Sequence, residues 1–477
     1  MSIEKLPQKE ILQFVDPVAF GLSRLSEYYR ECRFDICEYS LGIKLMWADT
    51  YEYEFAEAGG CLIAKDRYDG EIYFDYPLAK ADSDVDAALS AIEAYCLETD
   101  TPLRFATLPK HLLGELSARY DGARILQGYL TRDYLYQTED ILRFEGKKYA
   151  GQRNHIRRFY RNHPDATFRA FTAEDLPALE RFANRFDQRF QKSGEEANIE
   201  REAAFWMLRH NEDHLFRAGC MWVEGEIVGV AMGEKCGDTL VEHIEKALAA
   251  DYEGVYPALF QAFVCCFGDD CRKVNREDDA ADKGLRTSKM QYHPSQISAK
   301  YDLHVQNLLH SLDDVPTIHT ERLTLDEIRI SDAEVYESLC KDDARNRFWG
   351  YDYRVDLGDN KPDGAYFCRV AWTDFEEKRT LNFAIRKDDV MIGEAILYRF
   401  DGRGGAELGV RIHECYAGRG YGREAFSAVA DWALYSLGVV SLRAKCFREN
   451  LPSQKMISPV MRQIDEDDRM LYFEKRI

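Results

Sequence analysis

A recurring order of apolar and polar positions runs through the last part of the chain. Residues 406–412 (AELGVRI) alternate between apolar and polar side chains, as expected of a half-buried strand. A glycine-spaced turn follows at 418–422. Apolar residues then recur at helical spacing over 426–437, and Gly438 stands where a C-terminal cap belongs. Residues 439–447 alternate again, which predicts a second strand.

The same order of hairpin, strand, helix and strand is visible upstream, most clearly in the middle and last thirds. In each third, two apolar runs flank a polar turn, which is a hairpin signal. This repetition favours tandem folds of one type. The expected hairpins are 61–76, 220–234 and 381–399; helices follow at 85–97 and 256–267, and strands at 103–107, 239–246 and 272–275.

The glycine-spaced turn at 418–422 has the chemistry of an anion socket. Glycines let the backbone curl and expose successive N–H groups without a Cβ in the way. The helix that follows begins with N–H groups that have no partners inside the helix. Together these features favour binding of an anion such as a pyrophosphate, whereas a glycine-rich turn alone is also compatible with a flexible loop.

Strand, acidic residue, glycine-spaced loop, helix, strand and Asn-x-x-Ser together resemble the Gcn5-related N-acetyltransferases, in particular the branch that acetylates ribosomal-protein N-termini. The resemblance implies that the loop amides hold the pyrophosphate of acetyl-CoA. Two departures from the family pattern are Ala417, where arginine or glutamine is usual, and Ser458-Pro459, which interrupts the expected helix. The cofactor-binding positions that the resemblance implies are Arg419, Gly420, Tyr421, Gly422, Arg423 and Asn450.

Direct acetyl transfer requires that an acceptor amine lose its proton, because amines are mostly charged at neutral pH. The resemblance implies that Glu407 removes the proton, through water, and that Ser453 assists the departing thiolate. Ser453 could also cap a short helix. An exposed strand residue is the alternative interpretation of Glu407. No acyl-enzyme is required, so no role falls to a cysteine, and no metal is expected.

Residues 1–305 resemble a second family, the uncharacterised domains related to the catalytic region of phosphatidylglycerol lysyltransferase. The resemblance implies two Gcn5-like folds in tandem, and membrane-bound relatives transfer an amino acid from an aminoacyl-tRNA to a lipid. The stretches that carry it, in order, are 146–149 (GKKY), 153–156 (RNHI), 244–247 (IEKA), 275–279 (NREDD), 284–286 (GLR) and 288–294 (SKMQYHP).

Positive charge gathers at one place in the middle third. On a helix, Arg153, Arg157 and Arg161 would share one face, and Lys147 and Lys148 lie just before them. In a protein of net charge −21 this local inversion of sign could bind a phosphate-rich ligand, such as a tRNA acceptor end. A solvated face, or pairing with the acidic runs Glu277–Asp279 and Glu242/Glu245, is the structural alternative.

Other polar residues of the middle third are less specific. His155 and His243 are candidate bases, although a lone histidine is more often structural. Glu245 and Lys246 are adjacent on a strand, so only one can reach a shared cleft. Five polar residues at 275–279 follow a strand, which predicts either a loop or a site because such groups are expensive to bury unpaired.

Composition limits the remaining possibilities. The 477 residues are enough for two to four domains, and 45% are hydrophobic. The net charge argues against general nucleic-acid or anionic-membrane binding, and no run of about 18 apolar residues predicts a membrane span. The 13 scattered cysteines indicate reduced thiols in a cytoplasm. Cys265 and Cys266 lie in an apolar helix (FQAFVCCF) and are expected to pack in a core rather than to bind metal.

These observations predict an α/β (α+β) protein of three consecutive Gcn5-like folds, with mixed central sheets flanked by helices. The expected units are 1–140, 141–305 and 317–477, with a linker at 306–316. The predicted function is acetyl-CoA-dependent N-acetylation of a small-molecule or peptide amine by the last unit. Two alternatives remain: an aminoacyl-tRNA-dependent transferase with a regulatory last unit, or an N-terminal pair that serves as a non-catalytic recognition module.

Overall fold

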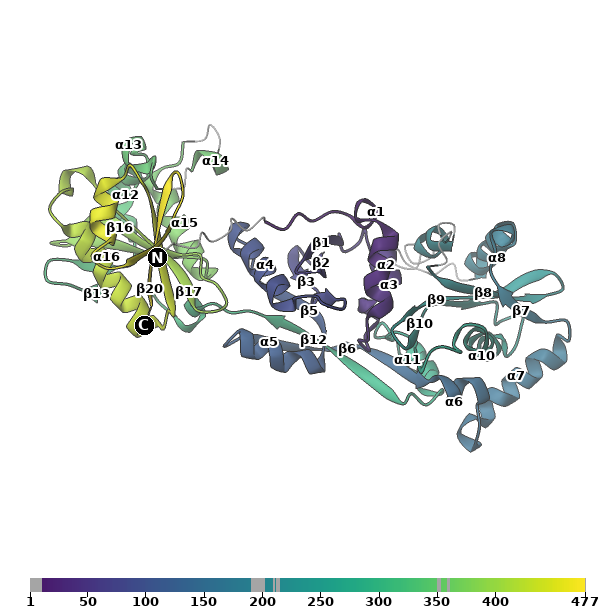
Figure 1. Ribbon diagram of the computed structural model, residues 1–477. Helices are drawn as coiled ribbons and strands as arrows, with labels where there is room; N and C mark the ends of the chain where they lie inside the picture. Colours follow the sequence, from purple (N-terminus) through teal and green to yellow (C-terminus); the bar gives the residue numbers. More distant parts are fainter. Residues whose placement is uncertain are drawn as a thin grey trace.

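The structure is a computed structural model that describes residues 11–189, 202–208, 211, 215–349, 353–357 and 361–476. It contains two mixed sheets with helices packed against them, and the molecule is elongated (Figure 1). The C-terminal sheet lies at one end, the elements of the first third lie in the middle, and those of the middle third lie at the other end. The predicted α/β fold class is confirmed.

The first sheet joins the first and middle thirds of the chain without a break. Its strand order is β1-β2-β3-β5-β12-β6-β11-β10-β9-β8-β7, and β4 pairs with β2. The strands are β1 (Glu54–Ala58), β2 (Cys61–Tyr68), β3 (Glu71–Phe74), β4 (Leu78–Ala79), β5 (Arg104–Pro109), β6 (Arg124–Gln137), β7 (Thr167–Ala170), β8 (Arg217–Val223), β9 (Glu226–Cys236), β10 (Thr239–Ala247), β11 (Lys273–Asn275) and β12 (Gln296–His304).

Helices cover this sheet, and α1 to α3 lie where the two thirds meet (Figure 1). One hydrophobic core contains residues of both thirds, among them Leu25 and Met232, and a second core packs α10 onto the middle third. The helices are α1 (Pro17–Phe20), α2 (Leu22–Glu31), α3 (Leu41–Met46), α4 (Val85–Glu98), α5 (Leu113–Arg119), α6 (Thr138–Arg143), α7 (Ala150–Asn162), α8 (Leu176–Arg189), α10 (Val255–Phe267) and α11 (Lys283–Met290).

The second sheet belongs to the last third and has the order β13-β14-β15-β16-β17-β18-β20-β19. Its elements are β13 (Ile318–His319), β14 (Thr324–Asp326), α12 (Ala333–Cys340), α13 (Asp343–Asn346), α14 (Arg354–Leu357), α15 (Gly364–Glu376), β15 (Leu381–Lys387), β16 (Val390–Tyr398), β17 (Gly405–Ile412), α16 (Tyr421–Trp432), β18 (Ser441–Phe447), α17 (Leu451–Ile457), β19 (Arg462–Glu466) and β20 (Met470–Arg476).

The predicted repetition is present in the strand pairing. In the middle third, β8, β9 and β10 are antiparallel neighbours, and β11 then joins β10 in parallel after helix α10. In the last third, β15, β16, β17 and β18 repeat this order around α16. The first third has the same order in β1, β2, β3 and β5 around α4. That each third is a complete Gcn5-like unit stays a prediction, as do the domain boundaries.

The C-terminal sheet is tied to the N-terminal part of the chain by specific contacts. Gly402 lies so close to Val305 that an added Cβ would come within 2.3 Å of the Val305 side chain. Arg399 forms an ion pair with Glu98 of α4. Leu309, inside the predicted linker, is fully buried in the C-terminal core. The predicted linker, residues 306–316, therefore packs against the C-terminal sheet and is not a free connection between the two parts.

One local expectation, that Cys265 and Cys266 pack in a core, is wrong. Cys265 and Cys266 are exposed, because Phe260, Phe263 and Val264 take the core-facing side of α10. All thirteen cysteines are free thiols. Within the described residues, no helix combines the length and the apolar character needed to cross a membrane.

Candidate functional site

A wedge opens between the two parallel strands of the C-terminal sheet. β17 and β18 pair only at Gly405–Glu407 with Ser441–Arg443, although both strands continue well beyond these residues. Their outer edges remain paired, β17 with β16 and β18 with β20. Past Glu407 the facing edges therefore carry backbone groups that no strand satisfies, which suits an extended ligand with amide groups.

The predicted glycine loop closes the wide end of this wedge. Gly418 and Gly420 have φ values of +74° and +81°, which favour glycine, and Gly420 is the N-cap of α16. The first N–H groups of α16 point out of the helix at this position. The predicted positions Gly420, Tyr421, Gly422 and Arg423 line the adjacent cavity. Arg419 does not, and its guanidinium lies 6.0 Å from the Tyr416 ring centroid.

The Glu424 carboxylate, one turn into α16, anchors the start of this helix and the glycine loop. Glu424 accepts hydrogen bonds from the Thr320 hydroxyl (2.6 Å) and from Arg322 Nε (2.7 Å). Burial would raise the pKa of Glu424, but Thr320 and Arg322 outweigh it and lower the pKa. Arg322 also donates to the Arg419 carbonyl at 3.2 Å. The turn between β13 and β14 thus clamps the loop, and the sequence pattern did not indicate this contact.

The opposite wall of the wedge is the short helix α17. Asn450, rather than Ser453, caps this helix: its Oδ1 accepts the Ser453 N–H at 3.3 Å. This corrects the expectation that Ser453 is the cap. The Ser453 side chain is thereby left for other contacts, and both residues line the cavity. α17 ends at Ile457, so Pro459 lies just outside it and breaks no helical hydrogen bond.

Glu407 lies at the closed end of the wedge. Its Oε1 is 2.9 Å from Arg399 Nε, and its Oε2 is 3.3 Å from Lys445 Nζ. Tyr398 lies beside it; burial and the Glu407 carboxylate raise the pKa of the Tyr398 hydroxyl. Tyr398 and Lys445 line the cavity, whereas Glu407 itself stands behind them. The predicted base therefore reaches the cavity only through these neighbours.

The cavity has a volume of about 1910 Å³ and extends beyond the C-terminal part of the chain. Residues of the N-terminal part, among them Glu93, Arg104 and His304, form part of its wall. The wall carries ten Lys and Arg residues against seven Asp and Glu residues, whereas the whole chain has 63 against 84. This reversal of charge suits an anionic ligand such as a CoA ester.

The predicted basic face lies on α7, at the far end of the molecule from this cavity (Figure 1). Arg153 donates to the carbonyl oxygens of Phe144 and Gly146 and is used structurally. Arg157 and Arg161 are exposed, and the structure shows no ion pair for them among the described residues. Lys147 is exposed, and Lys148 pairs with Asp140 at 3.2 Å.

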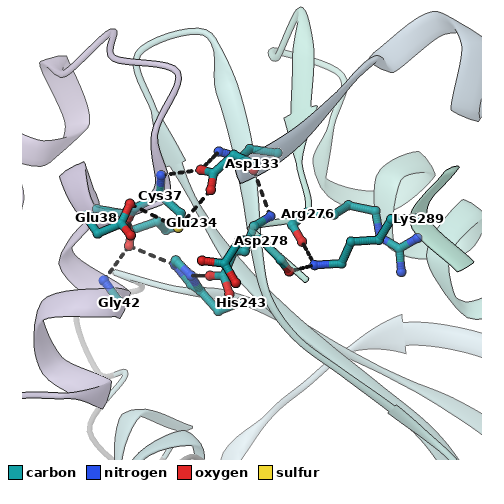
Figure 2. A network of polar contacts seen from close by, with 12 residues as sticks. Cys37, Glu38, Gly42, Asp133, Glu234, His243, Arg276, Asp278 and Lys289 are labelled. Carbon is teal, nitrogen blue, oxygen red and sulfur yellow. Dashed lines mark hydrogen bonds and ion pairs between the residues drawn. The ribbon is translucent and has the colours of Figure 1, made fainter. Parts of the chain in front are cut away.

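The acidic runs that were candidate partners of this face are engaged elsewhere. Glu242 and Glu245 both pair with Arg276, and Asp279 pairs with Arg286. The alternative in which these acids pair with the basic face is wrong, because other residues of the first sheet pair with them. The side chains at 275–279 are likewise paired rather than free (Figure 2).

Lys300 is the centre of one part of this network. Its buried ammonium lies 2.9 Å from Asp133 and 3.1 Å from Asp278, and it also contacts Glu38 and the Cys37 thiol. Burial acts against its charge, but the carboxylates, Asp133 foremost, raise the pKa of Lys300 well above its usual value. Cys37, Glu38 and Asp133 are close enough together to hold a metal ion, but the Lys300 ammonium already supplies a cation to all three.

His243 is the centre of the other part. Its Nε2 is 2.9 Å from Glu234 and its Nδ1 is 2.7 Å from Glu277, and the side chain is fully buried. Burial alone would lower its pKa, but the two carboxylates raise it to about 9. Gly42 faces the ring so closely that an added Cβ would meet Nε2 at 2.3 Å. The structure thus places His243 as a buried cation, while the other candidate, His155, is exposed.

The middle third contains a counterpart of the wedge between β10 and β11, and side chains of the protein itself fill it. β10 and β11 pair in parallel only at Thr239–Val241 with Lys273–Asn275. Arg276 then lies across the gap between Glu242 and Glu245, with its guanidinium 4.1 Å from the Phe260 ring centroid. The N-cap of α10, Gly254, has φ +87° like Gly420, but an added Cβ would lie 2.4 Å from the His155 carbonyl oxygen. Helix α7 therefore covers the position that is open at α16.

Comparison with known proteins divides the chain in the same way. Residues 29–304 match the family model described as phosphatidylglycerol lysyltransferase, C-terminal, and residues 322–459 match that of the acetyltransferase (GNAT) domain. Both families agree with the resemblances seen in the sequence.

Individual relatives match one part of the chain or the other. The uncharacterised N-acetyltransferase YnaD of Bacillus subtilis (strain 168) is 26% identical over 149 residues, which is 30% of this chain and 80% of the relative. The uncharacterised N-acetyltransferase p20 of Bacillus licheniformis is 25% identical over 143 residues, 30% of this chain and 79% of the relative. A conserved protein of unknown function from Bacteroides thetaiotaomicron VPI-5482 has a TM-score of 0.58 at 22% identity, covering 62% of this chain and 100% of that structure, which shows a shared fold alone.

Proposed function

The chain belongs to the family of phosphatidylglycerol lysyltransferase C-terminal regions, and on that premise we propose that its further C-terminal part transfers an acetyl group from acetyl-CoA to an amine. An acetyltransferase (GNAT) domain makes the chain an acyltransferase. The thirteen free thiols favour a reducing compartment, the cytoplasm, as its place of action.

One observation carries this proposal: the unpaired wedge between β17 and β18 leads to the N-terminus of α16 at Gly420. Amide-bearing pantetheine fits the free strand edges, and a pyrophosphate fits the loop amides and the positive end of the helix. The nearest atom to an added Cβ at Gly420 is a guanidinium nitrogen of Arg322, 3.5 Å away, so the approach is open and bounded by a cation.

The chain's own residues supply the remaining chemistry. Acetyl-CoA brings an activated thioester carbonyl, and backbone N–H groups along β17 polarise that carbonyl. Glu407 accepts the proton of the acceptor amine through water beside Tyr398, because Tyr398 and Lys445 separate it from the cavity. Ser453, whose hydroxyl is left free by the Asn450 cap, donates a hydrogen bond to the departing sulfur.

For the N-terminal part, we favour a recognition module over a second acetyl-CoA-dependent enzyme. The counterpart wedge is filled by Arg276, and the start of α10 is covered by α7. Arg157 and Arg161 remain exposed on α7, where a polyanion such as tRNA could bind. An aminoacyl-tRNA-dependent transferase remains the alternative, and transfer of a labelled amino acid from aminoacyl-tRNA by the full chain would favour it.

Isothermal titration calorimetry of the full chain tests the main proposal. We expect acetyl-CoA and CoA to bind with one-to-one stoichiometry, and pantetheine, which lacks the pyrophosphate, to bind at least 100-fold more weakly. Equal affinity for pantetheine and CoA would contradict the loop assignment. Mass spectrometry of a panel of amines and peptides incubated with acetyl-CoA would then identify the acceptor.

A further inference from the structure

Three neighbouring strands of the first sheet end in a row of basic side chains. His304, the last residue of β12, is paired with Arg104 of β5 on one side and with Arg124 of β6 on the other. Cross-strand partners present their side chains on the same face of a sheet. All three residues line the large cavity of the C-terminal part. We call Arg104, His304 and Arg124 the basic row.

The basic row is poorly neutralised by the protein itself. Arg104 pairs with Glu71, whose side chain is half exposed. Arg124 is exposed and forms no ion pair within the described parts of the chain. The Nε2 atom of His304 is buried and has no hydrogen-bond partner there. His304 thus has a guanidinium group on each neighbouring strand, and only one of the two is paired among the residues that the structure describes, so the row is suited to bind an anion.

The electrostatics of His304 agree with this geometry. Burial, then Arg104 and Arg124, lower the pKa of the imidazole, and Asp302 and Glu71 oppose this shift. The surroundings of His304 therefore favour the neutral imidazole in the free protein. An anion bound to the row would offset the two guanidinium groups and favour the protonated ring. The Tyr73 ring lies 5.9 Å from the His304 ring and adds a flat wall beside the row.

The row lies at the acceptor end of the cavity. The glycine loop follows the end of β17 at Ile412, whereas the N-terminal part meets the C-terminal part just before β17 begins, where Gly402 lies against Val305. Seven steps of a strand separate the two ends of β17 by roughly 23 Å. At this separation, a pyrophosphate at the glycine loop and an anion at the basic row are two different anionic groups.

We propose that the basic row binds a carboxylate or phosphate group of the acceptor, so that the enzyme selects amines that carry an acidic group. The first sheet, at the ends of β5, β12 and β6, then forms one wall of the acceptor site of the C-terminal enzyme. This inference rests on the proposed acetyltransferase function, because it assigns the acceptor of that reaction.

The test follows the His304 ring in the full chain by NMR with ¹³C-labelled histidine, assigned with a His304→Gln variant. The anionic probes are inorganic phosphate, O-phospho-L-serine and L-glutamate, and the neutral counterparts are L-serine and L-glutamine. We expect each anion to raise the pKa of His304 by about one unit or more, the effect of one opposite charge nearby, while the neutral amino acids leave it unchanged.

Variants separate the basic row from general ionic effects. Arg124→Gln, at an exposed position, should reduce the anion-induced shift, and Arg104→Gln with Arg124→Gln should abolish it. Arg67→Gln is the matched control, since Arg67 is a β2 arginine paired with Glu52 away from the cavity, and it should leave the shift intact. No response of His304 to any of the three anions would overturn the inference.

Two further outcomes separate this inference from the proposed function. A shift caused by CoA alone would assign the row to the cofactor and overturn the acceptor role. If acetyl-CoA binds and no anion moves His304, the inference fails while the acetyltransferase proposal stands. If acetyl-CoA does not bind but anions move His304, the proposed function fails, and the assignment of the anion to an acceptor fails with it.

Discussion

Arg399 joins Glu407 to the first third of the chain. Its Nε lies 2.9 Å from Glu407 Oε1, and its other end forms an ion pair with Glu98 of helix α4. The guanidinium lowers the pKa of Glu98. The proposed base of the C-terminal enzyme is therefore held by a residue whose own position depends on the N-terminal part, so the two parts of the chain are mechanically linked at the site.

Removing this link should affect turnover more than cofactor binding. Arg399→Gln deletes the cation that orients Glu407, and we expect kcat to fall about ten- to a hundredfold, as for a misplaced catalytic group. The affinity for acetyl-CoA, measured by calorimetry, should stay unchanged because the loop at Gly420 is remote. Glu98→Gln retains the contact to Glu407 and should cost at most about fivefold, since the lost ion pair is half exposed. Equal losses in both variants would show that the domain contact, not Glu407, is what Arg399 maintains.

The cofactor loop offers a second, simpler test. Gly420→Glu adds a side chain to a residue with φ +81° and a negative charge where the pyrophosphate is proposed to lie. We expect acetyl-CoA affinity to fall below detection in calorimetry. Gly438→Glu is the matched control, because Gly438 has φ +86° and nothing within 4 Å of an added Cβ. It carries the same backbone strain and charge in the same domain, so equal binding by both variants would refute the site assignment.

The exposed arginines of α7 predict salt-dependent polyanion binding. Arg157→Glu with Arg161→Glu should abolish any binding of tRNA to the full chain, because both side chains are exposed and reversal adds repulsion. Arg153 is left unchanged because it holds the Phe144 and Gly146 carbonyls. Fluorescence anisotropy with labelled tRNA should show an affinity that falls steeply with salt. Failure of the full chain to bind tRNA at low salt would favour the solvated-face interpretation.

Buried His243 predicts a pH-dependent stability. Its pKa is raised from 6.5 to about 9, so its contribution is complete below about pH 6.5 and is lost as the pH rises through about 9. His243→Gln leaves Glu234 and Glu277 without their shared cation, and should lower the free energy of unfolding by about 3–5 kcal/mol at pH 7. Urea denaturation should show a smaller difference at pH 9.5. Exposed His155→Gln should change stability by less than about 0.5 kcal/mol; a similar loss in both variants would contradict the buried-cation role.

The local parts of this site were predictable from the sequence. Alternating apolar residues predict the strand, glycines predict the loop, and helical spacing predicts the helix. All three signals lie within about thirty residues of one another. Even there, neighbouring cap residues compete: Asn450 and Ser453 both suit an N-cap, and Asn450 takes the position because Pro452 fits the first turn that follows it.

The long-range parts were not predictable, because they depend on how distant elements pack and on strand register. Glu424 clamps Thr320 across more than a hundred residues, and Arg399 reaches Glu98 across three hundred. The basic row requires that β5, β6 and β12 end in one line. A one-residue slip in any of these strands would turn its side chain to the other face, so no local pattern could place the three together.

The last prediction concerns Glu407 itself. Glu407→Gln removes the proposed base but keeps the size of the side chain and one oxygen for Arg399. We expect turnover to fall about 10²–10⁴-fold, the usual worth of general acid–base catalysis, with acetyl-CoA affinity nearly unchanged. The loss should shrink as pH rises, because more of the acceptor amine is then already neutral.

Ser453→Ala should lower turnover less and leave the pH dependence as in the wild type, since the serine acts on the leaving sulfur. Tyr398→Phe keeps the ring against Glu407 and tests whether the hydroxyl of this cavity-lining residue is needed for the proton to reach the Glu407 carboxylate. A pH–rate profile of Glu407→Gln parallel to that of the wild type would remove Glu407 from proton transfer, and its pairs with Arg399 and Lys445 would then account for its place in the strand.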